Sequence, residues 1–179
     1  SKAAVTISDA TYDASNRNVT MNASDLSSIG NATTGTVTLT NLQRISGNQS
    51  EVTAALVTEG SKVVAGTDNT IANVTNAVTA AQGKDIAAAS NIAAAFSGGV
   101  TDSISNLYST VNNAITTNFS AVRTEDTDVG VTINDSAYDA GNNNTTIAAT
   151  TLSGIGNQTT GTVTAVSYTH LTLPTSSQV

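Results

Sequence analysis

Residues 5–38 read "VTISDATYDASNRNVTMNASDLSSIGNATTGTVT", and residues 131–164 read "VTINDSAYDAGNNNTTIAATTLSGIGNQTTGTVT". The two segments align without a gap, and about two-thirds of the aligned positions are identical, which chance does not produce. The start positions, 5 and 131, lie 126 residues apart (131 − 5). Internal repetition of this kind is typical of proteins assembled from stacked units, each of which contacts only its neighbours.

Each copy of the repeat predicts a strand, a turn, a short helix and a second strand. Val5 and Ile7 alternate with polar residues, which is typical of a half-buried strand. Leu26 and Ile29 lie one helical turn apart, and Gly30 follows at the position where a helix C-cap is expected. The closing "GTVTLT" alternates again and predicts the second strand.

The stretch between the copies varies the same theme. "NQSEVTAALVTEG" predicts a helix with Ser50 as its N-cap, and "NTIANVTN" predicts a short strand. The Ala-rich stretch 77–96 is helix-prone, and residues 103–122 carry an apolar stripe at helical spacing. The predicted fold is therefore an α/β repeat, a solenoid-like stack of short parallel strands and short helices. The alternative is two β-rich repeats flanking a helical hairpin made of 77–96 and 103–122.

The chain divides at the repeat boundaries. The match between the copies stops after Thr164, and "AVSYTHLTLPTSSQV" follows, with the only histidine (His170) and the only proline (Pro174). "SYTHLTLPT" resembles translated sequencing adapter, which indicates a non-native tail; the alternative is a genuine terminal strand. We expect a fragment start, repeat copy 1, further strand–helix units, repeat copy 2 and the tail, at residues 1–4, 5–38, 39–130, 131–164 and 165–179.

Composition narrows the classes of function. Of 179 residues only 11% are charged, and the net charge is −7, an unsuitable balance for binding nucleic acid or an anionic membrane surface. No apolar run is long enough to span a bilayer, so no membrane insertion is expected. The chain has no cysteine, and no histidine outside the tail, so Ser–His and Cys–His catalysis are not expected. The sequence indicates no catalytic residues, and we expect no enzyme.

The motifs of the repeat also carry a family resemblance. "VTISDA" (5–10), "NVTNAVTAAQGKDIAAAS" (73–90) and "GGVTDSISNLYS" (98–109) resemble the units of very large Ala/Thr/Asp-rich repetitive, adhesin-like surface proteins of marine bacteria and cyanobacteria. The resemblance covers most of residues 5–164. It implies a structural or adhesive segment that is extracellular or on the cell surface. Its partners would be neighbouring repeats of the same chain and cell-surface or environmental ligands.

The turn after the first strand of each copy suggests a metal. Calcium binds oxygen ligands from carboxylates, amides and carbonyls, and both turns offer carboxylates and amides. The candidate ligands are Asp9, Asp13 and Asn16 in copy 1, and Asp135, Asp139 and Asn142 in copy 2. "TEDTDVG" adds Glu125, Asp126 and Asp128. A calcium-dependent binding module is therefore an alternative function. The competing interpretation is that Asp and Asn cap strands and form Asx-turns.

Threonines supply a third hypothesis. Thr34, Thr36, Thr38 and Thr40 share one strand face, as do Thr160, Thr162 and Thr164. Regular threonine arrays resemble the ice-binding face of some antifreeze solenoids, provided that successive layers align. The competing interpretation is the solvated side of a strand, since Thr is both β-branched and polar. The preferred function remains a structural or adhesive spacer without catalysis.

Overall fold

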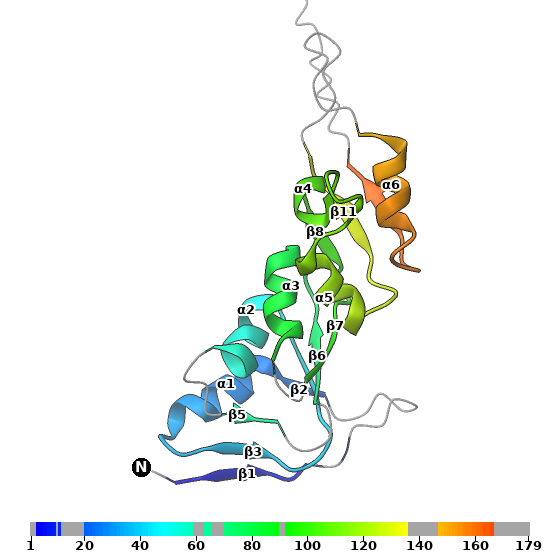
Figure 1. Ribbon diagram of the computed structural model, residues 1–179. Coiled ribbons are helices and arrows are strands. Elements are labelled where there is room, and N and C mark those ends of the chain that lie inside the picture. The colour runs from blue at the N-terminus through cyan, green and yellow to red at the C-terminus, as the bar shows by residue number, and fades with distance from the viewer. Residues whose placement is uncertain are drawn as a thin grey trace, which may run out of the picture.

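The computed structural model describes residues 3–9, 11, 20–58, 63–65, 70–89, 92–135 and 147–166. In this part the protein is a mixed α/β structure of short, mostly parallel strands and six short helices, α1 to α6 (Figure 1). The elements are β1 Val5–Ile7, β2 Thr20–Asn22, α1 Ala23–Ala32, β3 Val37–Leu39, β4 Arg44–Gly47, α2 Gln49–Val52, the π-helical turn η1 Thr53–Val57, β5 Val63–Val64, β6 Thr70–Val74, α3 Ala80–Ala87, β7 Ile92–Ala95, β8 Val100–Asp102, α4 Ile104–Leu107, β9 Tyr108–Ser109, β10 Ala114–Ile115, α5 Thr117–Glu125, β11 Val131–Ile133, α6 Ala149–Gly156 and β12 Val163–Ala165. The expected α/β class with parallel strands is confirmed.

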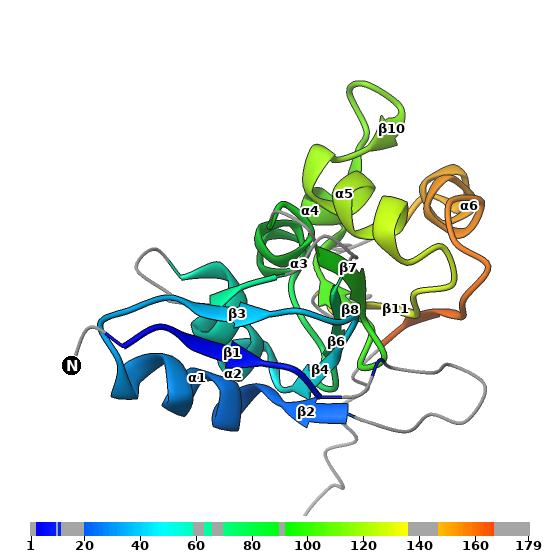
Figure 2. The ribbon, with the colours of Figure 1, turned by 90° about the horizontal axis from the view of Figure 1, so that it is seen from below.

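Three parallel sheets organise the described strands. Their orders are β1-β3-β5, β2-β4-β6-β7 and β12-β11-β8, and an isolated parallel bridge joins Val78 to Val100. A parallel pair cannot be closed by a tight hairpin, so the connections cross over, in most cases through a helix. Figure 1 shows β1 and β3 at one end of the described structure and α6 at the other. β1 lies beside β3 in this view and in Figure 2.

The two copies of the repeat build the same strand pair. β1 lies parallel to β3 with Val5 opposite Val37, and β11 lies parallel to β12 with Val131 opposite Val163. The flanking backbone bonds also match. The Val5 amide donates to Thr36 and the Val131 amide to Thr162, each at 2.9 Å. The equivalent helices, α1 and α6, lie between the paired strands in the chain, so sequence identity at a distance of 126 residues corresponds to equivalent geometry.

A threonine and a glycine hold each strand pair at its entrance, and we call this pair of residues the Thr–Gly clasp. In copy 2 the Thr159 hydroxyl donates to the Val129 carbonyl at 2.7 Å and accepts the Gly161 amide at 3.0 Å. In copy 1 the Thr33 hydroxyl donates to the equivalent Ala3 carbonyl and accepts the Gly35 amide at 3.0 Å. The clasp joins the turn before the second strand to the backbone before the first.

The core is a narrow stripe of small and branched apolar side chains. Val37 and Leu39 of β3 are fully buried while Thr38 between them is half-buried, as the alternation predicts. Phe96 and Phe119 are the only phenylalanines of the chain, and both are buried. The remaining large, fully buried side chains include Leu26, Ile45, Ile86, Leu107, Ile133 and Ile155. Parallel sheets covered by helices need such inward-facing aliphatic residues.

Two helix predictions were wrong. The Ala-rich stretch 77–96 is helical only at α3, and β7 follows as a strand of the four-stranded sheet. β7 is the edge strand of this sheet, and its pairing with β6 overrides the helix propensity of its alanines. The single helix expected at 103–122 is α4 and α5, separated by β9 and β10. Between those strands lies Asn113, whose φ of 50° lies in the left-handed region that ends regular helix. The helical hairpin alternative therefore does not describe this region.

Two cap predictions were also wrong. The helix expected from Ser50 begins at Gln49, and its N-cap is Asn48, whose side chain accepts the Glu51 amide in a capping box. Gly30 was expected just beyond a helix, but α1 continues to Ala32 and Gly30 is buried inside it. Both errors concern one or two residues at a helix end, where sequence patterns specify position least well.

The geometry of the Thr–Gly clasp predicts that its glycine cannot be replaced by a larger residue without loss of stability. A Cβ on Gly161 would lie 2.2 Å from the Asp128 carbonyl oxygen, and one on Gly35 would lie 2.4 Å from the Ala3 oxygen. Both contacts are with backbone, which cannot rotate away. We expect Gly161→Ala and Gly35→Ala to lower the free energy of unfolding by about 2 kcal/mol or more, measured by urea titration followed by circular dichroism.

Gly156→Ala is the matched control, because a Cβ there meets nothing within 4 Å. Its helical position makes the change neutral or slightly stabilising. Equal losses in all three variants would contradict the clasp, because the effect would then come from glycine replacement in general.

Candidate functional site

The most regular polar feature of the described residues is a set of three side chains, each of which caps a helix that lies earlier in the chain. Asn76 accepts the Gln49 amide at 2.6 Å, Asp102 accepts the Ala80 amide at 2.9 Å, and Asp135 accepts the Ile104 amide at 2.7 Å. Each donor is the first residue of its helix, α2, α3 or α4. We call these three acceptors, Asn76, Asp102 and Asp135, the capping ladder.

Strand register places each member of the capping ladder. Asp102 lies opposite Ile133, so the residues two positions further, Ile104 and Asp135, also lie side by side. Val78 is paired with Val100, so two residues further along Ala80 lies beside Asp102. Gly47 is paired with Val74, so two residues further along Gln49 lies beside Asn76. The first backbone amide of each helix is therefore placed next to an Asp or Asn side chain at the end of the paired strand or just after it.

The capping ladder complements the caps within each helix. The first four amides of a helix have no intrahelical partner. The local N-caps Asn48 and Thr79 accept the third amide of α2 and α3, while the capping ladder accepts the first. Asp102 is buried, and its second oxygen accepts from Ser103 and from the Asn106 side chain. A negative charge at a helix N-terminus is further stabilised by the helix dipole.

Of the six candidate calcium ligands, only Asp9 and Asp135 belong to the described residues. Asp13, Asn16, Asp139 and Asn142 lie outside the described residues. Asp135 contributes a carboxylate oxygen to the capping ladder, and the backbone carbonyl of Asp9 accepts from the side chains of Asn41 and Gln43. Within the described ranges, no three His, Asp or Glu side chains gather in a way that could hold a metal ion. The calcium site stays a prediction.

The acidic segment after α5 covers the outer edge of β7. Asp126 accepts the Phe96 amide at 2.6 Å, and Glu125 accepts the Ala94 amide at 3.3 Å. Carboxylates at these positions block the addition of another strand to this edge. Beside them lies a cavity of about 310 Å³, whose lining includes Arg44, Asn73 and Asp128.

The electrostatics of this cavity centre on Asp126. Burial raises the pKa of the Asp126 carboxyl above its usual 3.8, and the neighbouring Asp128 raises it further, while the bond from the Phe96 amide opposes both effects. Asn73 is buried, and its amide oxygen has no hydrogen-bond partner among the described residues although its nitrogen donates to Ser46. Arg44 in the same lining supplies positive charge, so the cavity is of mixed polarity.

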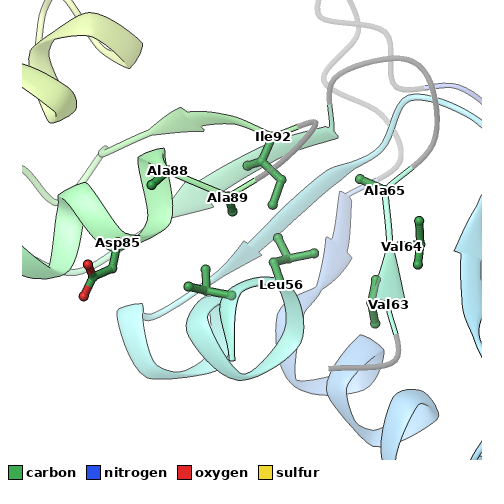
Figure 3. A pocket seen from close by; sticks show the side chains of 9 residues that line it. Leu56, Val63, Val64, Ala65, Asp85, Ala88, Ala89 and Ile92 are labelled. Atoms are coloured by element: carbon green, nitrogen blue, oxygen red, sulfur yellow. The ribbon is translucent and has the colours of Figure 1, made fainter. Parts of the chain in front are cut away.

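A larger pocket of about 450 Å³ lies between η1, β5 and the end of α3 (Figure 3). Among the described residues, its lining side chains are aliphatic except for Asp85. The side chains of Leu56, Val63 and Ile92 come from three different elements (Figure 3). Neither a nucleophile with a base nor a pair of carboxylates is found among these lining residues, so they offer no arrangement for acid–base or covalent chemistry.

The threonine faces align in part. Thr101, Thr132 and Thr164 are in register across β8, β11 and β12, and Thr6 is opposite Thr38 in the first sheet. Cross-strand threonine pairs stabilise a sheet through packing and hydroxyl contacts. The residues two positions before these threonines are Gly99, Gly130 and Thr162, which lie just before the strands. The row of aligned threonines therefore does not continue as a second complete row on that side. Ice binding stays a prediction.

Comparison with known proteins identifies no relative: no family model, no curated protein and no solved structure matches the chain. Among the described residues, no helix has both the length and the apolar character needed to cross a membrane.

Sequence reasoning did not select Asn76 and Asp102 as members of the capping ladder. A local signal was present, because Val74-Thr75-Asn76-Ala77 and Val100-Thr101-Asp102-Ser103 share the pattern Val-Thr-Asn/Asp-small. Helix α4 begins directly after the second of them, and α3 begins shortly after the first, at Ala80. The pattern alone does not say which helix the polar residue caps, since its partner amide lies 22 to 31 residues away in the chain.

The capping ladder predicts a stability loss that does not depend on calcium. Asp135→Ala leaves the Ile104 amide without its acceptor, and we expect it to lower the free energy of unfolding by about 1 kcal/mol. Asp135→Asn keeps an acceptor oxygen and should lose less. Urea titrations in calcium and in chelator should give the same loss. A loss seen only in calcium would instead identify Asp135 as a metal ligand.

The pair Asp126 and Asp128 predicts a pH dependence. A carboxyl whose folded pKa is raised binds its proton more tightly in the folded state, so its stabilising contribution is present at low pH and is lost as pH rises from 3.8 towards the folded pKa. Asp128→Asn removes one cause of the raised pKa. We therefore expect it to increase stability at pH 7 and to have little effect below about pH 4.

Asp85→Asn is the control for this experiment, because Asp85 is exposed and the variant makes the same change in net charge. Thermal melts from pH 3 to 8 measure both variants. An equal gain in both would assign the effect to net charge and contradict a specific Asp126–Asp128 interaction.

Proposed function

We propose that the chain is a structural segment of a long extracellular repeat protein, which acts as a spacer or display stalk without catalysis. The observation that carries the proposal is the equivalence of the two copies. Strand pairing, register and the Thr–Gly clasp recur after 126 residues, with the connecting elements arranged in chain order between them.

The finer proposal for the fold is a solenoid-like stack, in which each layer contributes short parallel strands and a helix. It is supported by the capping ladder, whose bonds each join one layer to the next, and by the parallel register of successive strands. Stability in such a stack is the sum of layer and interface contributions. Adding layers then lengthens the molecule without requiring a larger core.

The proposed mechanism is mechanical and interfacial. Backbone hydrogen bonds between parallel strands, together with the capping ladder, hold the layers in a fixed order, so repetition converts sequence length into reach. If each repeat presents one weak contact to a surface, many repeats raise the overall affinity through effective concentration. The proposed location, extracellular or on the cell surface, is supported by the resemblance of the repeat motifs to adhesin-like surface proteins.

The test uses a lengthened protein, which we call the two-period chain: residues 1–130 followed directly by residues 5–179. The junction preserves the order of the repeat, because Val5 takes the place of Val131 after Gly130. We expect small-angle X-ray scattering to give the same cross-section as the original chain and a greater maximum dimension, since each layer adds about 4.8 Å. An overall radius of gyration that follows the compact-domain scaling with length would contradict the stalk.

A further inference from the structure

We propose that the outer edge of β1 binds the strand and helix of a preceding repeat, of the same kind as β8 and α4, and that Asp9 caps that helix. The inference rests on the proposed function and identifies a partner surface for it. The occupant we assign is a preceding unit in the same tandem array, and its chemistry is read from the second copy of the repeat.

The second copy supplies the template. β11 is the central strand of its sheet, with β12 on one side and β8 on the other. β1 is equivalent to β11, and among the described strands it pairs only with β3, the equivalent of β12. The position that β8 occupies beside β11 therefore has no described counterpart beside β1.

Burial differs between the copies in the way this assignment requires. Val131 and Ile133 of β11 are 2% and 1% exposed. Their equivalents Val5 and Ile7 are only half-buried, although the residue types are the same and the partner strand is equivalent. Copy 2 differs in having β8 paired with β11, whereas no described strand takes that place beside β1. Two apolar side chains of β1 thus keep a partly exposed face that matches a surface already covered elsewhere in the molecule.

The backbone of β1 offers the same hydrogen-bonding groups as β11. The Gly130 carbonyl accepts the Val100 amide at 2.8 Å, and the Asn134 amide donates to Asp102 at 3.1 Å. The equivalents of Gly130 and Asn134 are Ala4 and Ser8. Alternate residues of a parallel strand point to opposite edges. Because Val5 and Ile7 bond to the β3 side, Thr6 and Ser8 point to the outer edge.

The two copies also share a carboxylate just after the first strand of the pair. Asp135 accepts the first amide of α4 at 2.7 Å, and Asp9 is its equivalent in copy 1. Asp9 is exposed, and the hydrogen bonds of the described residues reach only its backbone carbonyl. A strand like β8 placed on β1 in the register of Val100 and Val131 would bring the first amide of its helix to this carboxylate.

The experiment uses hydrogen exchange on the original chain and on the two-period chain, in which the second Val5 follows Gly130. In the original chain we expect the amides of Thr6 and Ser8 to exchange rapidly. In the second unit of the two-period chain we expect them to slow by at least about tenfold, towards the rates of Thr132 and Asn134. Unchanged exchange would overturn the proposal, as would slow exchange in the original chain that depends on concentration, because a second copy would then occupy the edge.

A variant gives an independent arm. Asp9→Ala should leave the melting temperature of the original chain unchanged. In the second unit of the two-period chain it should lower the melting temperature by a few degrees, as Asp135→Ala does in the original chain. Asp85→Ala, at another exposed carboxylate, should be neutral in both chains. Equal effects of Asp9→Ala in both chains would overturn the capping role.

Failure here is distinguishable from failure of the proposed function. A two-period chain that scatters as an extended but flexibly jointed particle, with rapidly exchanging Thr6 and Ser8 amides, would leave the stalk intact and overturn the edge assignment. A two-period chain that collapses to compact scaling would overturn the stalk itself.

Discussion

The structure depends on the parallel register between successive strands. β4 and β8 run almost directly into α2 and α4, and the first amides of a helix have no partner within that helix. Register places the side chain of the next strand at the first of these amides, as with Asp102 at Ala80 and Asp135 at Ile104. A one-residue slip would move every cap to a wrong position and turn each inward valine outward. Packing and capping therefore specify the same alignment.

A thin core makes close backbone approach necessary. Few large side chains are available, so the elements pack through small residues. At Gly83 in α3, a Cβ would lie 2.5 Å from the side chain of Val122 in α5. The glycine of the Thr–Gly clasp has the same effect between strands, because it brings backbone against backbone at the start of each pair. Close approach of the backbones increases the number of van der Waals contacts, and their dispersion energy offsets the small size of the alanine side chains.

Local patterns predicted most elements of the repeat itself, strands and helices alike, and failed mainly in the stretch between the two copies. β1, β3, β6 and β11 were predicted because alternation of apolar and polar residues is a property of the segment itself. β7 was missed because its alanines carry no preference strong enough to indicate a strand, and pairing with β6 decides its conformation. Asn76 and Asp102 were missed because their function depends on an amide in another layer. Sequence patterns indicate the conformation of one segment, whereas these caps join two segments that are distant in the chain.

The differences between the two copies indicate which residues the repeat requires. The segments ending in "TTGTVT" are nearly identical, and they contain the Thr–Gly clasp and the second strand of each pair. Asp25 at an exposed position of α1 is replaced by Thr151 in α6. Thr151 is buried in α6, so this change of residue accompanies a change in packing, whereas the hydrogen bonds of the Thr–Gly clasp are the same in both copies. The strand pair and its clasp are therefore the part of the repeat in which sequence and described geometry agree most closely, because there the backbone of one strand meets that of the other.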